Sequence, residues 1–450
     1  MNDDRHRNQE VLGEDRLGRR ARVFGTEQAI LAGIDPGTVR GGLSAEDSMR
    51  ELESLAETAG IPTLASVLQR RERPVPRTFL GKGKVEEVRR AADELGADVV
   101  IFNDELSPAQ ARNLEETLKR KVVDRTQLIL DIFAQRAATK EARLQVELAQ
   151  LRYLLPRLRG WGMALTRTGG GIGTRGPGET QLDLDRFKVN RRIHALKERL
   201  EKTADERAVR GKKRIRSPIP QVALVGYTNS GKSTLLNRLC DADSVVEDKL
   251  FATLDTMVRR GPVASGRDAL FVDTVGFIRD LPHDLVPAFA ATLEAVRDAN
   301  LILHIVDRSR RRWDEDERVV LEILEGEVFR AEDRRPPTLL VLNKVDAVRD
   351  ENADPTDAVP ISAKEGTNLD DLRDRIAQTL YPSDRLVTLL VPFAAVGTLY
   401  ARTTPERIEV LEHRESGMLV RARVSEQELA ELKAGGVTLS ASGAARGERP

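Results

Sequence analysis

The segment that most constrains this chain is Gly226-Tyr-Thr-Asn-Ser-Gly-Lys-Ser233, which lies between an apolar run and a helix-like run. It fits the pattern G-x-x-x-x-G-K-[ST] in the strand–loop–helix setting that this pattern requires. Its glycines let the backbone wrap around a phosphate, and its N–H groups point inward at the N-terminus of the new helix. Lys232 is expected to reach the β- and γ-phosphates, and Ser233 to offer its hydroxyl to Mg²⁺. The segment predicts a nucleoside triphosphate site and leaves the base undecided.

Two further motifs predict how the metal and the γ-phosphate are held. Asp273-Thr-Val-Gly276 follows an apolar strand, so its aspartate can hold the water shell of Mg²⁺ and the Gly276 N–H can meet the γ-phosphate. In Phe251-Ala-Thr-Leu-Asp255, Thr253 is the expected second hydroxyl ligand and the γ-phosphate sensor of a mobile switch. The predicted catalytic residues are Lys232, Thr253, Asp273 and Gly276, and the predicted metal ligands are Ser233 and Thr253.

Two later motifs select the base. The aspartate of Asn343-Lys-Val-Asp346 can accept from guanine N1–H and N2–H₂ together, while Asn343 reaches N7. Adenine would leave that carboxylate unpaired, which can discriminate by roughly 10⁴. Ser362-Ala-Lys364 can present a backbone N–H to guanine O6. The predicted GTP-binding residues are Gly226, Tyr227, Thr228, Asn229, Ser230, Gly231, Lys232, Ser233, Phe251, Ala252, Thr253, Leu254, Asp255, Asp273, Thr274, Val275, Gly276, Asn343, Lys344, Val345, Asp346, Ser362, Ala363 and Lys364.

Phe277 follows the Asp-x-x-Gly motif, where Ras-like GTPases carry a glutamine that orients water. A phenyl ring cannot orient water by hydrogen bonding. One interpretation is slow intrinsic hydrolysis, with the missing group supplied by another loop or a partner. The alternative is that Phe277 packs, and that the backbone and Mg²⁺ hold the water.

The rest of the 450 residues predicts a multidomain α/β protein. Alternating strands and helices over 26–125 indicate an N-terminal parallel-sheet α/β domain. Residues 126–217 read as a helical hairpin with a basic linker, 218–381 as a Ras-like P-loop domain with a doubly wound sheet, and 382–435 as a small C-terminal α/β domain. Residues 1–25 and 436–450 are polar, and we expect them to be disordered. Phe79-Leu-Gly-Lys-Gly-Lys84 fits a phosphate loop or a tight strand-to-helix turn equally well.

The hairpin carries two apolar seams and a glycine-rich tip. Leu144 and Leu148 begin one seam, and Val189 and Ile193 begin the other, at a spacing that suits antiparallel helices. The tip, residues 160–178, holds eight glycines. The tip is either a flexible linker or a loop that adapts its conformation to RNA. The second alternative arises because arginine, glycine and tryptophan are typical of RNA-binding loops. The candidate RNA-binding residues are Trp161, Arg167 and Arg175.

The distribution of charge and the cysteine content limit the possible partners, bound groups and cellular compartment. The chain has 72 basic and 72 acidic residues, but residues 186–217 hold thirteen Lys or Arg against four Asp or Glu. This basic run is either a solvated helix face or a contact with a polyanion. The single cysteine, Cys240, excludes an intramolecular disulfide and a zinc cluster. Without a long apolar run or a signal peptide, we expect a cytoplasmic monomer with no stable membrane insertion, with partial peripheral membrane association as an alternative.

Together, the motifs resemble those of HflX-type GTPases, within the translation-factor-related GTPases. The resemblance spans about residues 30–425 and adds three segments: Phe79–Glu87, Gly173–Leu182 and the continuation of the Asp273 motif to Asp284. It implies the four domains above, Mg²⁺, and binding of the large ribosomal subunit, whose rRNA the glycine-rich tip approaches near the peptidyl transferase centre. It also implies splitting of stalled or idle ribosomes under stress, and in some members ATP binding by the N-terminal domain.

The chain departs from the family pattern at Thr256-Met257, where Pro-Thr is usual, and at Asp183–Phe187, where Glu-Thr-Asp-Arg-Arg is usual. The first departure affects the course of the switch, and the second affects the RNA contacts of the helix. We therefore predict a GTP hydrolase coupled to ribosome splitting or rescue. The alternatives are an RNA-binding scaffold with GTP as a structural or regulatory ligand, and a signalling G protein with a protein or membrane target.

Overall fold

The computed structural model describes residues 27–37, 44–158, 186–203, 219–241, 250–251, 257–279, 290–329, 335–348, 354–382, 384–403 and 407–440. The chain forms two compact units, Met1–Gln135 with Gln150–Ile193, and Arg136–Ala149 with His194–Pro450. None of the helices in the described ranges is long and apolar enough to cross a membrane. The predicted multidomain α/β class is confirmed.

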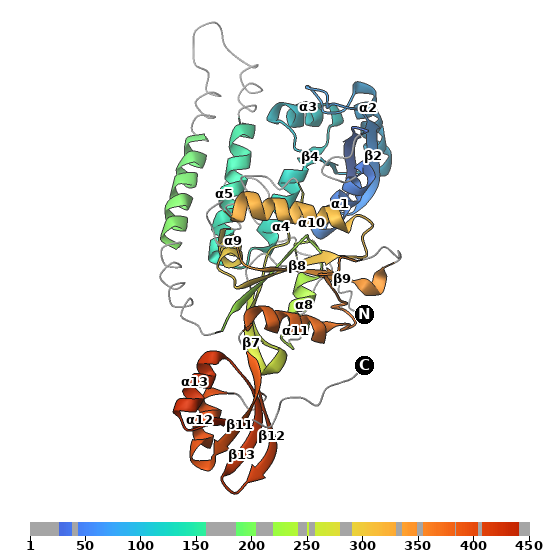
Figure 1. The fold of residues 1–450 in the computed structure, drawn as a ribbon. Coiled ribbons are helices and arrows are strands. Elements are labelled where there is room, and N and C mark those ends of the chain that lie inside the picture. The colour runs from blue at the N-terminus through green and yellow to red at the C-terminus, as the bar shows by residue number, and fades with distance from the viewer. Residues whose placement is uncertain are drawn as a thin grey trace, which may run out of the picture. The chain divides into compact units, whose positions relative to one another are not determined.

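The first unit contains a four-stranded parallel sheet in the order β2-β1-β3-β4 (Figure 1). Helices α2 and α3 pack on one face through a core that includes Val88, Leu114 and Phe102. Helix α3 starts with a capping box, in which Ser107 and Gln110 satisfy each other's backbone N–H groups. The elements are β1 (Ala29–Asp35), α1 (Ala45–Thr58), β2 (Thr63–Arg70), α2 (Lys82–Leu95), β3 (Val99–Phe102), α3 (Pro108–Leu118) and β4 (Lys121–Asp124).

The segment Phe79–Lys84 forms a turn into α2. Phe79 is buried with φ 61°, and Gly81 is the N-cap of the helix. The Gly81 N–H donates to Gln69 Oε1 at 2.9 Å and is therefore used within the protein. The segment forms a tight turn into a helix, and phosphate binding by it stays a prediction.

Two helices follow the sheet where the sequence predicts one long helical stretch. α4 (Arg125–Arg136) ends before residues 137–139, and α5 (Lys140–Arg157) then begins. The C-terminal part of α5 is tied to the end of β4, because Asp124 accepts from the Tyr153 hydroxyl at 2.7 Å and from Arg157 at 3.1 Å. Residues 186–203 form the second predicted helix. The seam residues Leu144, Leu148, Val189, Ile193 and Leu196 are buried. The predicted tip lies outside the described residues.

The second unit contains a six-stranded sheet in the order β10-β9-β8-β5-β7-β6 (Figure 1). All its neighbours are parallel except β6 and β7, which are antiparallel. The sequence analysis did not predict β6, whose Arg259, Arg260, Gly261 and Pro262 lack an apolar pattern. Proline is tolerated there because β6 is an edge strand. The strands are β5 (Gln221–Gly226), β6 (Met257–Val263), β7 (Arg267–Asp273), β8 (Leu301–Asp307), β9 (Thr338–Asn343) and β10 (Val359–Pro360).

Helices cover both faces of this sheet, as expected for strands that are near-continuous Val, Leu and Ile. α8 (Lys232–Leu239) and α11 (Leu369–Leu380) lie on one face, where Leu236, Leu372 and Phe271 share a core, and α9 (Ala290–Arg297) and α10 (Trp313–Ile323) lie on the other. Cys240 caps α8 and is partly buried against that core. Because the strands are parallel, the carboxyl ends of β5, β7, β8 and β9 meet at one edge.

The last part of the second unit is an antiparallel sheet in the order β12-β13-β11-β14, with two helices on one face (Figure 1). Leu399 and Leu432 from these helices pack against Val420 and Ala422 of the central strand. Strands and helices are both present over residues 382–435, as expected for an α/β segment. β14 was not predicted, and it corrects the expectation that residues 436–450 are all disordered, because Thr438 and Leu439 pair with β11. The elements are β11 (Arg385–Pro392), α12 (Val396–Arg402), β12 (Ile408–Arg414), β13 (Gly417–Val424), α13 (Glu426–Ala434) and β14 (Thr438–Leu439).

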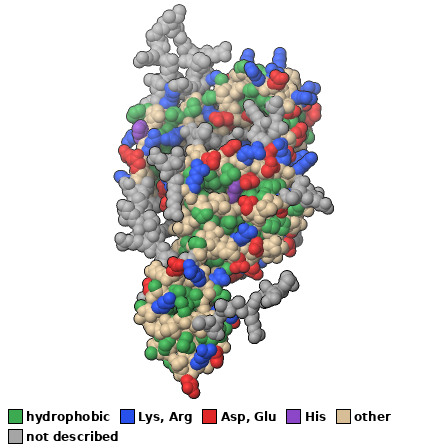
Figure 2. All heavy atoms as spheres, in the orientation of Figure 1, with side chains coloured by type: hydrophobic (Ala, Val, Ile, Leu, Met, Phe, Trp, Pro, Cys, Tyr) green, Lys and Arg blue, Asp and Glu red, His purple; other side chains and the backbone are tan. Residues whose placement is uncertain are grey.

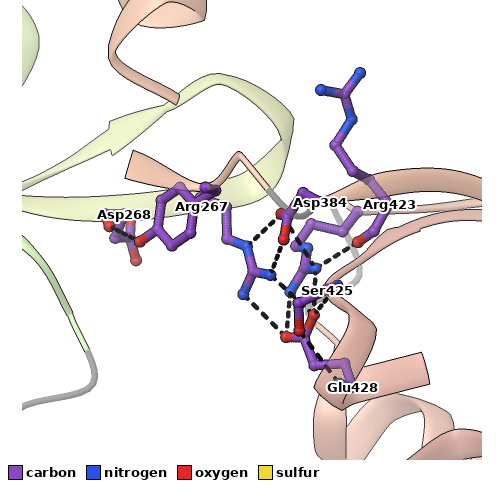
Figure 3. Close-up of polar contacts among 8 residues, drawn as sticks. Arg267, Asp268, Asp384, Arg423, Ser425 and Glu428 are labelled. Atoms are coloured by element: carbon purple, nitrogen blue, oxygen red, sulfur yellow. Dashed lines mark hydrogen bonds and ion pairs between the residues drawn. The ribbon is translucent and has the colours of Figure 1, made fainter. Parts of the chain in front are cut away.

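An ionic cluster joins this sheet to the start of β7 (Figure 3). Arg267 donates to both carboxylate oxygens of Asp384, at 2.8 and 2.7 Å, and to both of Glu428, at 2.9 and 2.8 Å. Arg407 donates to the same two oxygens of Glu428, at 3.0 and 2.9 Å. Two carboxylates are therefore shared by two guanidinium groups. On the face of the molecule shown in Figure 2, by contrast, charged side chains of both signs are interspersed.

Candidate nucleotide-binding site

The phosphate loop has a backbone shape that its glycines make possible. Gly231, the N-cap of α8, has φ 93°, and Asn229 has φ 60°. Both lie in the left-handed region that glycine and asparagine tolerate best. At Gly226 a Cβ atom would lie 2.2 Å from the Ile305 carbonyl oxygen of β8, so only glycine fits. The loop thus opens directly above the carboxyl ends of β5 and β8.

Lys232 is buried beneath the phosphate loop, and its ammonium group contacts the backbone of that loop. Its ammonium donates to the carbonyl oxygens of Gly226, at 3.1 Å, and Tyr227, at 2.8 Å. Burial lowers the pKa of Lys232 to about 8, against the opposing effect of Asp273. A phosphate placed over the loop would raise this pKa again, because an opposite charge nearby favours the protonated form.

Asp273 and Ser233 face each other across the place predicted for the metal. The Ser233 hydroxyl donates to Asp273 Oδ2 at 2.7 Å, and Asp273 is fully buried at the end of β7. The following Thr274 donates to the Leu224 carbonyl oxygen of β5 at 2.6 Å, which fixes the start of the segment. A Cβ atom at Gly276 would lie 3.0 Å from Lys232 Nζ, so this backbone passes directly beside the lysine.

Phe277 is a buried packing residue in this structure, with 6% of its surface exposed. Its backbone pairs with the phosphate loop, since its N–H donates to Gly226 O at 3.1 Å and its carbonyl accepts from Thr228 N–H at 2.7 Å. This packing fits both interpretations of Phe277, because in either of them the ring itself does not orient the water. A ring held in this way contributes no hydrogen bond to water.

Asn343 connects the phosphate loop to the Ser362–Lys364 segment. Its Nδ2 donates to the Ser230 carbonyl of the phosphate loop at 2.9 Å, and its Oδ1 accepts from the Ala363 N–H at 2.9 Å. The Ala363 N–H is thereby used within the protein, so a donor to guanine O6 would have to come from a neighbouring residue. Asp346 is exposed in the turn Val345–Ala347, where its carboxylate is accessible to a base.

Two residues that the sequence analysis did not single out, and one side-chain role that it did not predict, support this site. Arg238 of α8 donates to the carbonyl oxygens of Ala363, at 3.1 Å, and Lys364, at 2.6 Å. Asp307, at the end of β8, pairs with Lys344 at 2.8 Å. Tyr227 is predicted as part of the loop, but the role of its hydroxyl, which accepts from the Arg279 N–H at 3.0 Å, is not. Only Asp307 has a sequence signal, its place at a strand end next to β5 and β9.

Several predicted residues lie outside the described part of the chain. Phe251 is described, and its side chain is buried with φ 54°, so a contact with nucleotide would come from its backbone. No group of three or more His, Cys, Asp or Glu that could hold a metal occurs among the described residues. The predicted residues that are not described are Trp161, Arg167, Arg175, Ala252, Thr253, Leu254 and Asp255.

The fold and the site together define a P-loop GTPase, because a phosphate loop, a DxxG segment and an Asn-Lys-x-Asp turn meet at one edge of a doubly wound sheet. Three family profiles match the chain in succession. They are described as "GTP-binding GTPase N-terminal" (residues 46–134), "GTP-binding GTPase Middle Region" (136–214) and "50S ribosome-binding GTPase" (221–344).

Curated relatives extend this match over most of the chain. It is 45% identical over 384 residues to GTPase HflX of Caldanaerobacter subterraneus, which covers 84% of this chain and 88% of the relative. It is 46% identical over 355 residues to GTPase HflX of Escherichia coli, covering 77% and 82%. With that of Lacrimispora saccharolytica the identity is 43% over 414 residues, covering 90% and 95%. The chain belongs to the HflX family of GTPases, which confirms the resemblance and the GTPase activity predicted from the motifs.

Proposed function

We propose that this GTPase binds the large ribosomal subunit and couples GTP binding and hydrolysis to the splitting or rescue of ribosomes under stress, in the cytoplasm. The observation that carries the proposal is the match of residues 221–344 to the family described as a 50S ribosome-binding GTPase. The basic run at 186–217 and the predicted RNA-binding residues of the tip add support, since rRNA is a polyanion.

The site supports hydrolysis through groups already in place. Lys232 would stabilise charge on the β- and γ-phosphates, and the Gly276 N–H would meet the γ-phosphate. Magnesium fits the donors, because it uses one or two protein oxygens together with phosphates and water. Ser233 and Thr253 would hold it, with Asp273 orienting the water shell. When bound, Mg²⁺ would neutralise charge between the β- and γ-phosphates.

The nucleotide state would then set the arrangement of the switch segments. GTP contacts at 251–255 and 273–277 favour one arrangement, and loss of the γ-phosphate releases it. We propose that the GTP arrangement is the one that binds the ribosome. The Phe277 ring makes no hydrogen bond to water. We therefore also propose that binding to the ribosome determines when the protein hydrolyses GTP.

Sedimentation with ribosomal subunits tests this proposal. The protein is pelleted with large subunits in a non-hydrolysable GTP analogue, in GDP and without nucleotide, at rising salt. Binding favoured by the analogue and weakened by salt is expected. A variant with Arg167, Arg175 and the basic residues of 186–217 neutralised is expected to bind less. Equal binding in every nucleotide state would contradict the coupling, and binding unaltered in the neutralised variant would contradict the RNA contact.

A further inference from the structure

A buried cluster connects the phosphate loop to the segment that follows the Asp-x-x-Gly motif. The Tyr227 hydroxyl accepts from the Arg279 N–H at 3.0 Å. The backbone of Phe277, between them, pairs with the loop on both sides. Three hydrogen bonds thus hold residues 277–279 against the loop that binds phosphate.

The side chain of Arg279 is anchored on a separate helix. Its Nη2 donates to Asp316 Oδ1 of α10 at 2.9 Å, and Glu315 lies 3.8 Å from its Nη1. Arg310 donates to the other oxygen of Asp316. The guanidinium carbons of Arg279 and Arg310 lie 5.9 and 5.5 Å from the centre of the Tyr227 ring. The segment is therefore fixed to α10 as well as to the loop.

The free energy needed to bury these charges means that stability alone does not account for the cluster. Arg279 is 7% and Asp316 4% exposed. Removing charges from water costs several kcal/mol per ion, so a buried ion pair is often no more stable than apolar residues of similar volume. What the cluster supplies is a defined geometry, because the fork of an arginine accepts few arrangements of its partners.

We propose that Tyr227, Arg279 and Asp316 are positioning residues for GTP hydrolysis. They hold the Gly276–Phe277 backbone where it meets the γ-phosphate and the attacking water. A glutamine side chain could adjust to the water, but a buried phenyl ring cannot, so placement of the water depends on the backbone around it. The segment passes beside the catalytic lysine, since a Cβ at Gly276 would lie 3.0 Å from Lys232 Nζ. Small displacements here reduce the rate steeply. The inference concerns the hydrolysis step and does not depend on the ribosome.

Tyr227→Phe tests the proposal with the smallest change, the loss of one hydroxyl. Single-turnover hydrolysis is measured without ribosomes, alongside GDP affinity and thermal unfolding. The rate is expected to fall about five- to tenfold, with GDP affinity changed less than about twofold. The control is Tyr381→Phe, which removes a hydroxyl that donates to the Asp268 carbonyl at 2.7 Å at the far end of β7. It is expected to leave the rate within about twofold.

Asp316→Asn and Arg279→Lys extend the test to the anchor on α10. Both are expected to lower kcat while KM for GTP stays within about threefold, because the contacts act on the reacting geometry and not on ground-state binding. An unchanged rate in Tyr227→Phe would overturn the proposal. So would an equal fall in Tyr381→Phe, or a loss of GDP affinity as large as the loss of rate.

Discussion

Asn343 illustrates what a single residue contributes beyond the role that its motif predicts. The motif predicts a contact with guanine N7. The structure adds that its amide bridges Ser230 and Ala363, which are 113 and 20 residues away in sequence. The identities of Lys232, Asp273 and Asp346 could be predicted because their roles depend on local spacing. The bridges of Asn343, Arg238 and Tyr227 could not, since they depend on how distant loops meet.

Asp346 is expected to determine which nucleotide base the protein binds. In Asp346→Asn the amide can accept from guanine only once and presents an N–H toward the 2-amino group. GTP affinity is therefore expected to fall by roughly 10²-fold or more, while xanthosine triphosphate, which has a carbonyl at that position, gains affinity. Binding of both nucleotides to the variant and the wild type measures this.

The matched control for this change is Asp370→Asn. Asp370 is 98% exposed at the start of α11, in a surface pair with Arg373. It is expected to leave both affinities unchanged within about twofold. A variant at Asp346 that keeps its preference for GTP would show that the carboxylate does not recognise the base.

Lys232 is expected to make nucleotide affinity depend on pH. Burial lowers its pKa to about 8 without nucleotide, and bound phosphate would raise that pKa. Nucleotide binds the charged form better, so affinity is fully present below about pH 8 and falls above it, by up to roughly tenfold per pH unit. GDP affinity between about pH 7 and about pH 9 measures the effect.

Lys232→Arg is the control, because an arginine stays charged throughout this range. Any slope that remains in the variant comes from ionisation of the nucleotide or of other groups. The account of Lys232 is wrong if GDP affinity is independent of pH in the wild type, or falls equally in the variant.

At the level of elements, the sequence predicted the strands and helices that carry a regular local pattern. It missed features that depend on how an element packs against others. The buried parallel strands β5, β8 and β9 are continuous apolar runs, and the capping box at Ser107 marks the start of α3. β6 was missed because it is an edge strand, half exposed, whose only partner is β7. The break between α4 and α5 was missed because helical periodicity continues across it.

The cluster around Arg267 is the element-scale feature with the clearest effect on stability. Arg267→Gln would leave Asp384 and Glu428 with Arg407 as their remaining shared partner. Unfolding free energy is expected to fall by roughly 2–4 kcal/mol, as for a broken buried pair. Arg385→Gln is the control, since its pair with Glu426 is exposed, 69% and 66%. It is expected to cost less than about 1 kcal/mol, and equal losses in urea unfolding would contradict the account.

The same cluster is expected to make the unfolding free energy depend on pH, and the direction follows from the pKa of Glu428. Burial alone would raise the pKa of Glu428, but hydrogen bonds from Arg407, the Ser425 N–H and Arg267 outweigh it and hold the pKa at about 2. A depressed carboxyl pKa stabilises the fold above the unfolded pKa of about 4.3, and this contribution is lost as pH falls toward 2. The difference between wild type and Arg267→Gln is therefore expected to shrink in acid. A difference that stays constant would contradict this assignment.

At the scale of the whole molecule, the six-stranded sheet that carries the nucleotide site is one of three sheets in the described residues. The zero net charge of the chain conceals a basic run of thirteen Lys or Arg against four Asp or Glu at 186–217. The family membership explains the order of the domains. A ribosomal partner could be predicted from the sequence only through the resemblance, because partner recognition lies in surface residues without a chemical signature of their own.

The most direct test of the central claim is GTP turnover by the full chain with and without purified large ribosomal subunits. A GTPase whose DxxG segment lacks a water-orienting side chain is predicted to be slow alone and to be accelerated at least roughly tenfold by saturating subunits. The variant with Arg167, Arg175 and the basic run neutralised is predicted to keep its basal rate and lose the acceleration. Turnover that is the same with and without subunits would contradict the claim that the ribosome controls this switch.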